Sequence, residues 1–184
     1  MHRRLPAPGL LRTLLRKGGR NLPLGTPLYT PSYIPTGDES AVFDTSEGII
    51  RVQLAGKDAP IHVGNFVELA QKGFYNGLKF HRYVPGFVIQ GGDPLGNGTG
   101  GPGYRIKGEW TTNPHNSHDD GALAMARSQM PDSAGSQFYF CLGPQPGLDG
   151  GYTVFGQTIE GKDVIAKLRV GSTINSITIE NAAQ

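Results

Sequence analysis

The chain has 184 residues, enough for one domain with a short extension and a substantial core. Its 28 glycines and 14 prolines are spread along the chain, which disfavours a helical bundle. Residues 1–37 carry six of the 17 basic residues and none of the 15 acidic ones, so the net charge of +2 conceals a mildly acidic body. That body gives no reason to expect nucleic acid as the main partner.

Residues 1–36 form a basic segment that we expect to be a flexible leader, docked loosely on the rest of the chain. Four leucines lie among basic residues between positions 10 and 17. A short amphipathic helix for a membrane surface or an acidic partner is therefore one alternative, and a targeting peptide is another. A secretory signal is disfavoured, because proline, glycine and arginine interrupt the apolar residues.

Cys141 is the single cysteine, so no internal disulfide can form, which favours a reducing compartment. It lies in an apolar run and is expected to be a buried small hydrophobe rather than a nucleophile. No stretch approaches 18 consecutive apolar residues, so no membrane span is predicted. We expect a cytoplasmic, bacterial protein, and a monomer, since long insertions are absent.

Alternating apolar and polar residues predict short strands along the body. The first two, at residues 41–45 and 48–54, are separated by Ser46 and Glu47, which suit a hairpin turn. Further strands are expected at residues 78–81, 87–90, 123–126, 137–142, 153–157 and 176–180.

Helical spacing predicts a helix that Asp58 caps and Gly73 ends, and a second helix over residues 161–168. Many short strands with turn signals and two helices indicate a mainly β fold. The expected architecture is a closed β-barrel with helical caps, in a domain over residues 37–184.

The most informative segment runs from Phe80 to Asp93 and combines a cation, aromatic residues and an amide. Arg82 stays charged at any physiological pH, so beside apolar neighbours it can serve as a fixed electrophile. A second segment, Gly135 to Phe140, is again aromatic with a single amide. Together the two segments resemble the cyclophilin family of peptidyl-prolyl cis/trans isomerases, and the resemblance extends from Ala41 to Ile179. It implies a closed, eight-stranded antiparallel barrel with a helix over each end.

The reaction that this resemblance implies is rotation about an X-Pro peptide bond, whose barrier of about 18–20 kcal/mol comes from amide resonance. Lowering that barrier requires no nucleophile, metal or cofactor. It requires an apolar slot for the proline ring and a donor that stabilises the twisted amide. The implied partners are proline-containing peptides and unfolded proteins.

Four residues match the catalytic set of the family. Arg82 corresponds to the catalytic arginine, and Phe87 to a wall of the proline pocket. Gln90 and Gln137 match two glutamines, one steadying the arginine and substrate, the other contacting the substrate backbone. The alternatives are structural: a surface ion pair for the arginine, and satisfied core amides for the glutamines.

A further set matches the substrate-binding positions of the family, with ordinary core packing as the alternative for its apolar members: Val88, Met125, Ala126, Arg127, Tyr139, Leu148 and Tyr152. Tyr139 stands where phenylalanine is common, and its added hydroxyl must find a partner or water. Arg127 replaces a frequent asparagine, so extended peptides are expected to bind differently. Gly147 replaces a tryptophan that contacts cyclosporin in many members, which predicts weak binding of that drug.

Two other patterns are set aside. Residues 96–101 satisfy G-x-G-x-x-G, but prolines surround the motif and no helix follows, so a turn-rich loop is expected rather than a dinucleotide site. His115, His118, Asp119 and Asp120 crowd together without helical register, which favours a solvated loop over a metal site.

The sequence therefore predicts a prolyl isomerase that assists protein folding. Two alternatives remain open: a module or chaperone that binds proline peptides without meaningful turnover, and a scaffold tethered through the basic leader.

Overall fold

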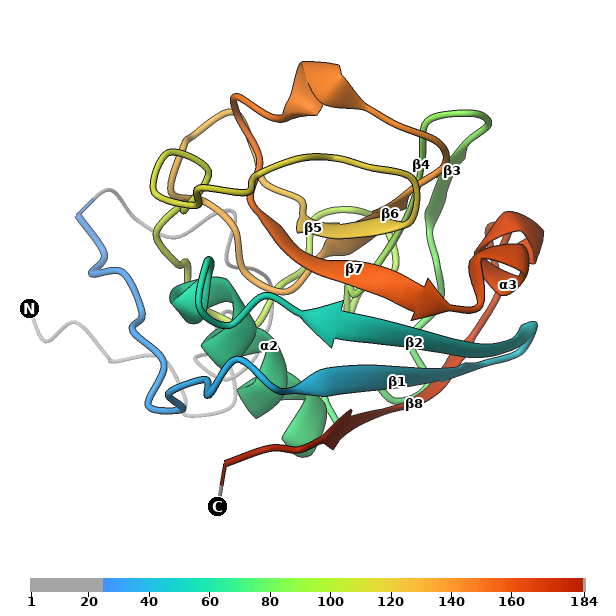
Figure 1. The fold of residues 1–184 in the computed structure, drawn as a ribbon, viewed down its shortest axis with the longest axis horizontal. Helices are drawn as coiled ribbons and strands as arrows, with labels where there is room; N and C mark the ends of the chain where they lie inside the picture. Colours follow the sequence, from blue (N-terminus) through green and yellow to red (C-terminus); the bar gives the residue numbers. More distant parts are fainter. Residues whose placement is uncertain (1–24, 184) are drawn as a thin grey trace, which may run out of the picture.

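The computed structural model describes residues 25–183, and Figure 1 shows one curved sheet with a helix on either side of it. The strands are β1 Ser40–Thr45, β2 Gly48–Leu54, β3 Arg82–Val84, β4 Val88–Gly91, β5 Ala122–Met125, β6 Phe138–Cys141, β7 Val154–Glu160 and β8 Ile174–Glu180. The helices are α2 Pro60–Gln71, α3 Lys162–Lys167 and the short 3₁₀ turn η1 Pro146–Leu148. No helix within residues 25–183 is both long and apolar enough to cross a membrane.

The eight strands form an antiparallel sheet in the order β3-β4-β6-β5-β7-β2-β1-β8. The predicted mainly β fold with eight antiparallel strands and two helices is confirmed, but the prediction of a closed barrel is wrong. In the part of the chain that the structure describes, β3 and β8 are edges and do not pair with each other. An isolated bridge from Lys79 to Thr173 and neighbouring backbone hydrogen bonds, such as that from Phe80 to Ser172, span the gap.

Strand positions agree with the predictions within a few residues, apart from the region around β3. A strand was expected at residues 78–81, whereas the regular pairing begins at Arg82 and continues through a tight turn into β4. The reason is geometric: residues just before Arg82 face the irregular loop that precedes β8, so they form a bridge instead of a ladder.

Alternation along β6 divides the apolar residues between two clusters, because successive side chains of a strand point to opposite faces. Phe138 and Phe140 are fully buried in the main core, where their rings lie 5.6 and 5.2 Å from that of Phe43. Tyr139 and Cys141 point the other way, into a smaller cluster on the opposite face. This second cluster supports the candidate site described below.

Helix α2 is capped from a distance. Asp58 was predicted to cap it, but that carboxylate instead lies 2.9 Å from Nδ1 of His115. The first turn donates to Glu109, which is 4% exposed: Ile61 N–H at 3.1 Å and His62 N–H at 2.8 Å, with His62 Nδ1 at 2.7 Å. One buried carboxylate thus accepts hydrogen bonds from the N–H groups of the first helical turn, a role that a capping side chain next to the helix usually has.

Of the predicted leader, residues 1–24 lie outside the described part of the chain. Residues 25–36 pack against α2 through Glu68, whose carboxylate accepts hydrogen bonds from the Tyr29 hydroxyl (2.5 Å) and from the N–H groups of Ser32 (2.6 Å) and Tyr33 (2.9 Å). The predicted boundary at residue 36 therefore does not mark where contact with the domain begins.

Candidate active site

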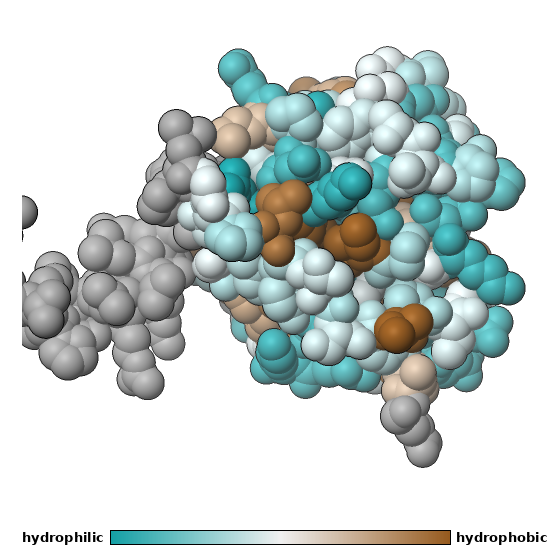
Figure 2. All heavy atoms as spheres, turned by 90° about the vertical axis from the view of Figure 1, so that its left-hand side faces the viewer, coloured by the Kyte–Doolittle hydropathy of each residue, from teal (hydrophilic) through white to brown (hydrophobic). Residues whose placement is uncertain are grey.

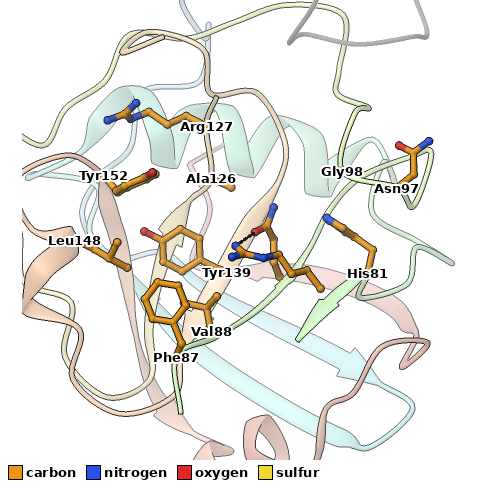
Figure 3. A pocket seen from close by; sticks show the side chains of 12 residues that line it. His81, Phe87, Val88, Asn97, Gly98, Ala126, Arg127, Tyr139, Leu148 and Tyr152 are labelled. Carbon is orange, nitrogen blue, oxygen red and sulfur yellow. Dashed lines mark hydrogen bonds between the residues drawn. The ribbon is translucent and has the colours of Figure 1, made fainter. Parts of the chain in front are cut away.

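A pocket of about 640 Å³ opens on the face of the sheet that carries the second apolar cluster. Nine residues predicted from the sequence line it: Arg82, Phe87, Val88, Gln90, Ala126, Arg127, Tyr139, Leu148 and Tyr152. Figure 3 shows Tyr139, Val88 and Phe87 side by side, with Leu148 and Tyr152 at one end and His81 at the other. The pocket combines an apolar floor with polar groups, which is the usual character of a small-ligand site.

Two predicted residues do not line this pocket. Met125 was expected at its floor, but it is 1% exposed and belongs to the main core. Strand alternation explains the difference, since Ala124 and Ala126 flank Met125 and face the second cluster. Gln137 is 2% exposed and lines a small neighbouring cavity.

Gln137 nevertheless reaches the pocket through a chain of amides. Arg82 Nη1 donates to Gln90 Oε1 at 3.3 Å, the dashed contact in Figure 3. Gln90 Nε2 donates in turn to Gln137 Oε1 at 2.9 Å, and Gln137 Nε2 donates to the carbonyl oxygen of Gly100 at 2.8 Å. This series of hydrogen bonds fixes the orientation of both amides. The guanidinium of Arg82 therefore donates to an oxygen of Gln90 that is already held in position by Gln137.

The hydroxyl of Tyr139 also finds a partner. It lies 2.8 Å from Nε2 of His118, whose Nδ1 lies 2.8 Å from Oδ1 of Asp149. Burial lowers the pKa of His118 and outweighs the opposite effect of Asp149, so the imidazole is neutral at neutral pH. Nδ1–H then donates to the carboxylate, and Nε2 accepts from the tyrosine.

This arrangement corrects the expectation of a solvated loop at His118. The imidazole is buried and makes hydrogen bonds on both sides. One is to Tyr139 in the floor of the pocket, and the other is to Asp149, which follows Leu148 in the sequence. Within residues 25–183, no three His, Cys, Asp or Glu side chains are grouped to hold a metal ion.

Comparison with known proteins identifies the family. A sequence model described as cyclophilin type peptidyl-prolyl cis-trans isomerase/CLD matches residues 41–183. The chain belongs to this family. This cyclophilin-type isomerase is 49% identical over 144 residues to a peptidyl-prolyl cis-trans isomerase of Helicobacter pylori strain 26695, covering 77% of this chain and 87% of that protein. It is 50% identical over 141 residues to a peptidyl-prolyl cis-trans isomerase of Synechococcus elongatus, covering 76% of this chain and 94% of that protein.

A crystal structure of a Cryptosporidium parvum cyclophilin type isomerase, solved in the presence of the dipeptide Ala-Pro, has the same fold. Its TM-score is 0.71 at 31% identity, covering 77% of this chain and 99% of the other. The resemblance seen in the sequence is thus confirmed, and the chain is a cyclophilin-type peptidyl-prolyl cis-trans isomerase.

In this isomerase, the glycine-rich motif at residues 96–101 is a loop beside the pocket, as expected. It wraps around the carboxylate of Asp93, which accepts from the N–H groups of Leu95 (2.8 Å), Asn97 (3.0 Å) and Gly98 (2.5 Å). A Cβ at Gly100 would lie 2.0 Å from Oδ1 of Asp93, so only glycine fits there. The loop therefore binds an internal anion rather than a nucleotide phosphate.

The stability contributed by Asp93 should depend on pH. Burial raises the pKa of Asp93, whereas the backbone N–H donors lower it. The combined effect of the donors is larger than that of burial, so the pKa lies below the ordinary 3.8. The folded state therefore binds fewer protons than the unfolded chain, and stability falls as the pH drops through the folded pKa. We expect Asp93→Asn to destabilise the protein clearly at about pH 7 and less at about pH 3.

Urea unfolding of both proteins at the two pH values measures this difference. An equal loss of stability at both pH values would contradict the internal-anion role of the loop.

Cys141, the single cysteine of the sequence, is buried in the second apolar cluster, which also contains Tyr139. Burial, with smaller effects of nearby aspartates, raises the pKa of its thiol to about 12. The thiol is therefore protonated at physiological pH, as expected for a small hydrophobe rather than a nucleophile.

Proposed function

We propose that this isomerase accelerates rotation of X-Pro bonds in unfolded or exposed segments of proteins, with the pocket around Tyr139 as its active site. One observation carries the proposal: the guanidinium of Arg82, held by Gln90, stands beside an apolar slot walled by Phe87 and Val88. The Ala-Pro dipeptide in the structure of the Cryptosporidium relative supports a proline-containing substrate.

In the proposed mechanism, the proline ring packs over Tyr139 between Phe87 and Leu148, which leaves the preceding amide near Arg82. As the amide twists, its nitrogen becomes pyramidal and gains a lone pair. A fixed cation that favours this state over both planar states lowers the barrier. Gln90 and Gln137 hold Arg82 and the neighbouring backbone in place, so little reorganisation is needed during the step.

Exchange NMR on a short Ala-Pro peptide tests this function directly. Cis-to-trans exchange should speed up in proportion to the enzyme concentration. Binding of the peptide without faster exchange would instead assign the chain to the class of proline-binding modules.

We also propose weak binding of cyclosporin. Gly147 directly precedes Leu148, which lines the pocket, and a Cβ added at Gly147 would meet no atom within 4 Å, so no side chain at this position is present to contact an apolar ligand. Gly147→Trp should restore such a wall and raise the affinity by roughly tenfold or more, the effect of burying one aromatic side chain. Calorimetric titration measures both proteins. Nanomolar affinity of the wild type, or no gain in the variant, would contradict the prediction.

The protein is further proposed to be a cytoplasmic monomer. Figure 2 supports the monomer on the face it shows, where apolar residues form small separate patches within a mainly hydrophilic surface. Obligate interfaces are usually broad and apolar. Light scattering across a range of concentrations tests the oligomeric state.

A further inference from the structure

Arg127 follows β5 at the rim of the pocket, and its guanidinium is locked in place. The group contacts two aromatic rings, 4.9 Å from the centroid of Trp110 and 4.6 Å from that of Tyr152. Its Nε donates to the carbonyl oxygen of Gly151 at 2.7 Å, and Nη1 donates to that of Ser128 at 2.9 Å. A planar cation that contacts two aromatic rings and is tied to two carbonyls has little freedom to turn away.

The charge of this cation is not balanced within the pocket. The residues that line it include two arginines, Arg82 and Arg127, and no aspartate or glutamate. Across residues 25–183, neither arginine forms an ion pair with a carboxylate. The carboxylate of the rim segment, Asp149, is directed to the buried His118 instead.

The two cations occupy different parts of the slot. In Figure 3, Arg127 lies beyond Tyr152, at the end of the pocket away from His81 and Asn97. A peptide whose proline ring covers Tyr139 and whose chain runs toward Tyr152 brings a neighbouring residue close to Arg127.

We propose that Arg127 is a specificity-determining residue that favours substrates with aspartate or glutamate next to the proline and disfavours those with lysine or arginine. The proposal rests on the proposed function of the pocket. A carboxylate a few ångströms from a fixed, partly desolvated cation should gain about five- to thirtyfold in kcat/KM over a lysine at the same position.

Exchange NMR with blocked peptides tests the proposal. Two series place Glu, Gln or Lys immediately before or immediately after one proline, and each catalysed rate is divided by the uncatalysed rate of that peptide. In the wild type, kcat/KM should follow Glu above Gln above Lys in at least one series, and added salt should reduce the ratio of Glu to Lys.

The deciding variants are Arg127→Gln and, as a matched control, Lys167→Gln, which removes the same charge from an exposed position in α3. The ratio of kcat/KM for the Glu peptide to that for the Lys peptide should fall toward one in Arg127→Gln. It should stay at its wild-type value in Lys167→Gln. Because each ratio is taken within one variant, a change in overall activity does not affect it.

An unchanged ratio in Arg127→Gln, a ratio indifferent to salt, or equal rates for all wild-type peptides would overturn the proposal. Failure of the proposed function has a different signature, since the wild type would then accelerate none of the peptides.

Discussion

Replacing Arg82 by alanine should lower kcat/KM for an Ala-Pro peptide by about 10²–10³-fold, the loss measured when one fixed donor is removed from a preorganised site. The expected size follows from the geometry. Arg82 is held by Gln90, which is held by Gln137, so the cation is placed before the substrate arrives. Affinity for the peptide in its planar states should change much less, because the donor acts on the twisted amide. Line-shape analysis of the exchanging peptide separates the two effects.

Arg169 provides a matched control for this substitution. It is also an arginine close to β3, where its guanidinium lies 4.5 Å from the ring centroid of Tyr83, but it does not line the pocket. Arg169→Ala should leave the exchange rate close to that of the wild type. If Arg82→Ala retained full activity, the electrostatic mechanism would be wrong even though the slot binds proline.

Removing the carboxylate of Glu109 should cost about 3–5 kcal/mol in the free energy of unfolding, as expected when one partner of a buried pair is lost. Glu109→Ala leaves two backbone N–H groups of the first turn of α2 and the Nδ1 atom of the buried His62 without their acceptor. The groups of His62 have little access to water, because His62 and Glu109 are only 1% and 4% exposed. Urea unfolding of the variant measures the loss.

Glu160 is the matched control for Glu109. It pairs with Arg51 at 3.6 Å, but its side chain is 69% exposed, so Glu160→Ala should cost less than about 1 kcal/mol. Similar losses in both variants would show that the buried cap contributes no more than a surface ion pair.

Local pattern predicted the first two strands because apolar and polar residues alternate along them. In β2, apolar residues stand at every second position from Ile50 to Leu54, and the structure places those side chains together in the main core. The cap of α2 could not be predicted, because its acceptor Glu109 lies 47 residues from His62 in the sequence. The open edge of the sheet depends likewise on how the loop around Thr173 meets Lys79, which no local signal encodes.

The candidate site was predictable where the family resemblance extended to individual side chains. Nine of the predicted residues line one pocket. Met125 was misplaced although the strand was recognised, because residues 123–126 are all apolar and give no sign of which face is which. The contact of His118 with Tyr139 was missed for a related reason: a buried hydroxyl signals that a partner exists, but not which of the nearby histidines supplies it.

The burial of Cys141 has a practical consequence. A buried, protonated thiol should resist maleimides at neutral pH, so the native protein offers such reagents no reactive thiol at this position. A cysteine introduced at an open position, such as Gly147, would then carry a single fluorophore next to Leu148, which lines the pocket. The arrival and release of unlabelled polypeptides could be followed there in real time, without first removing the native cysteine.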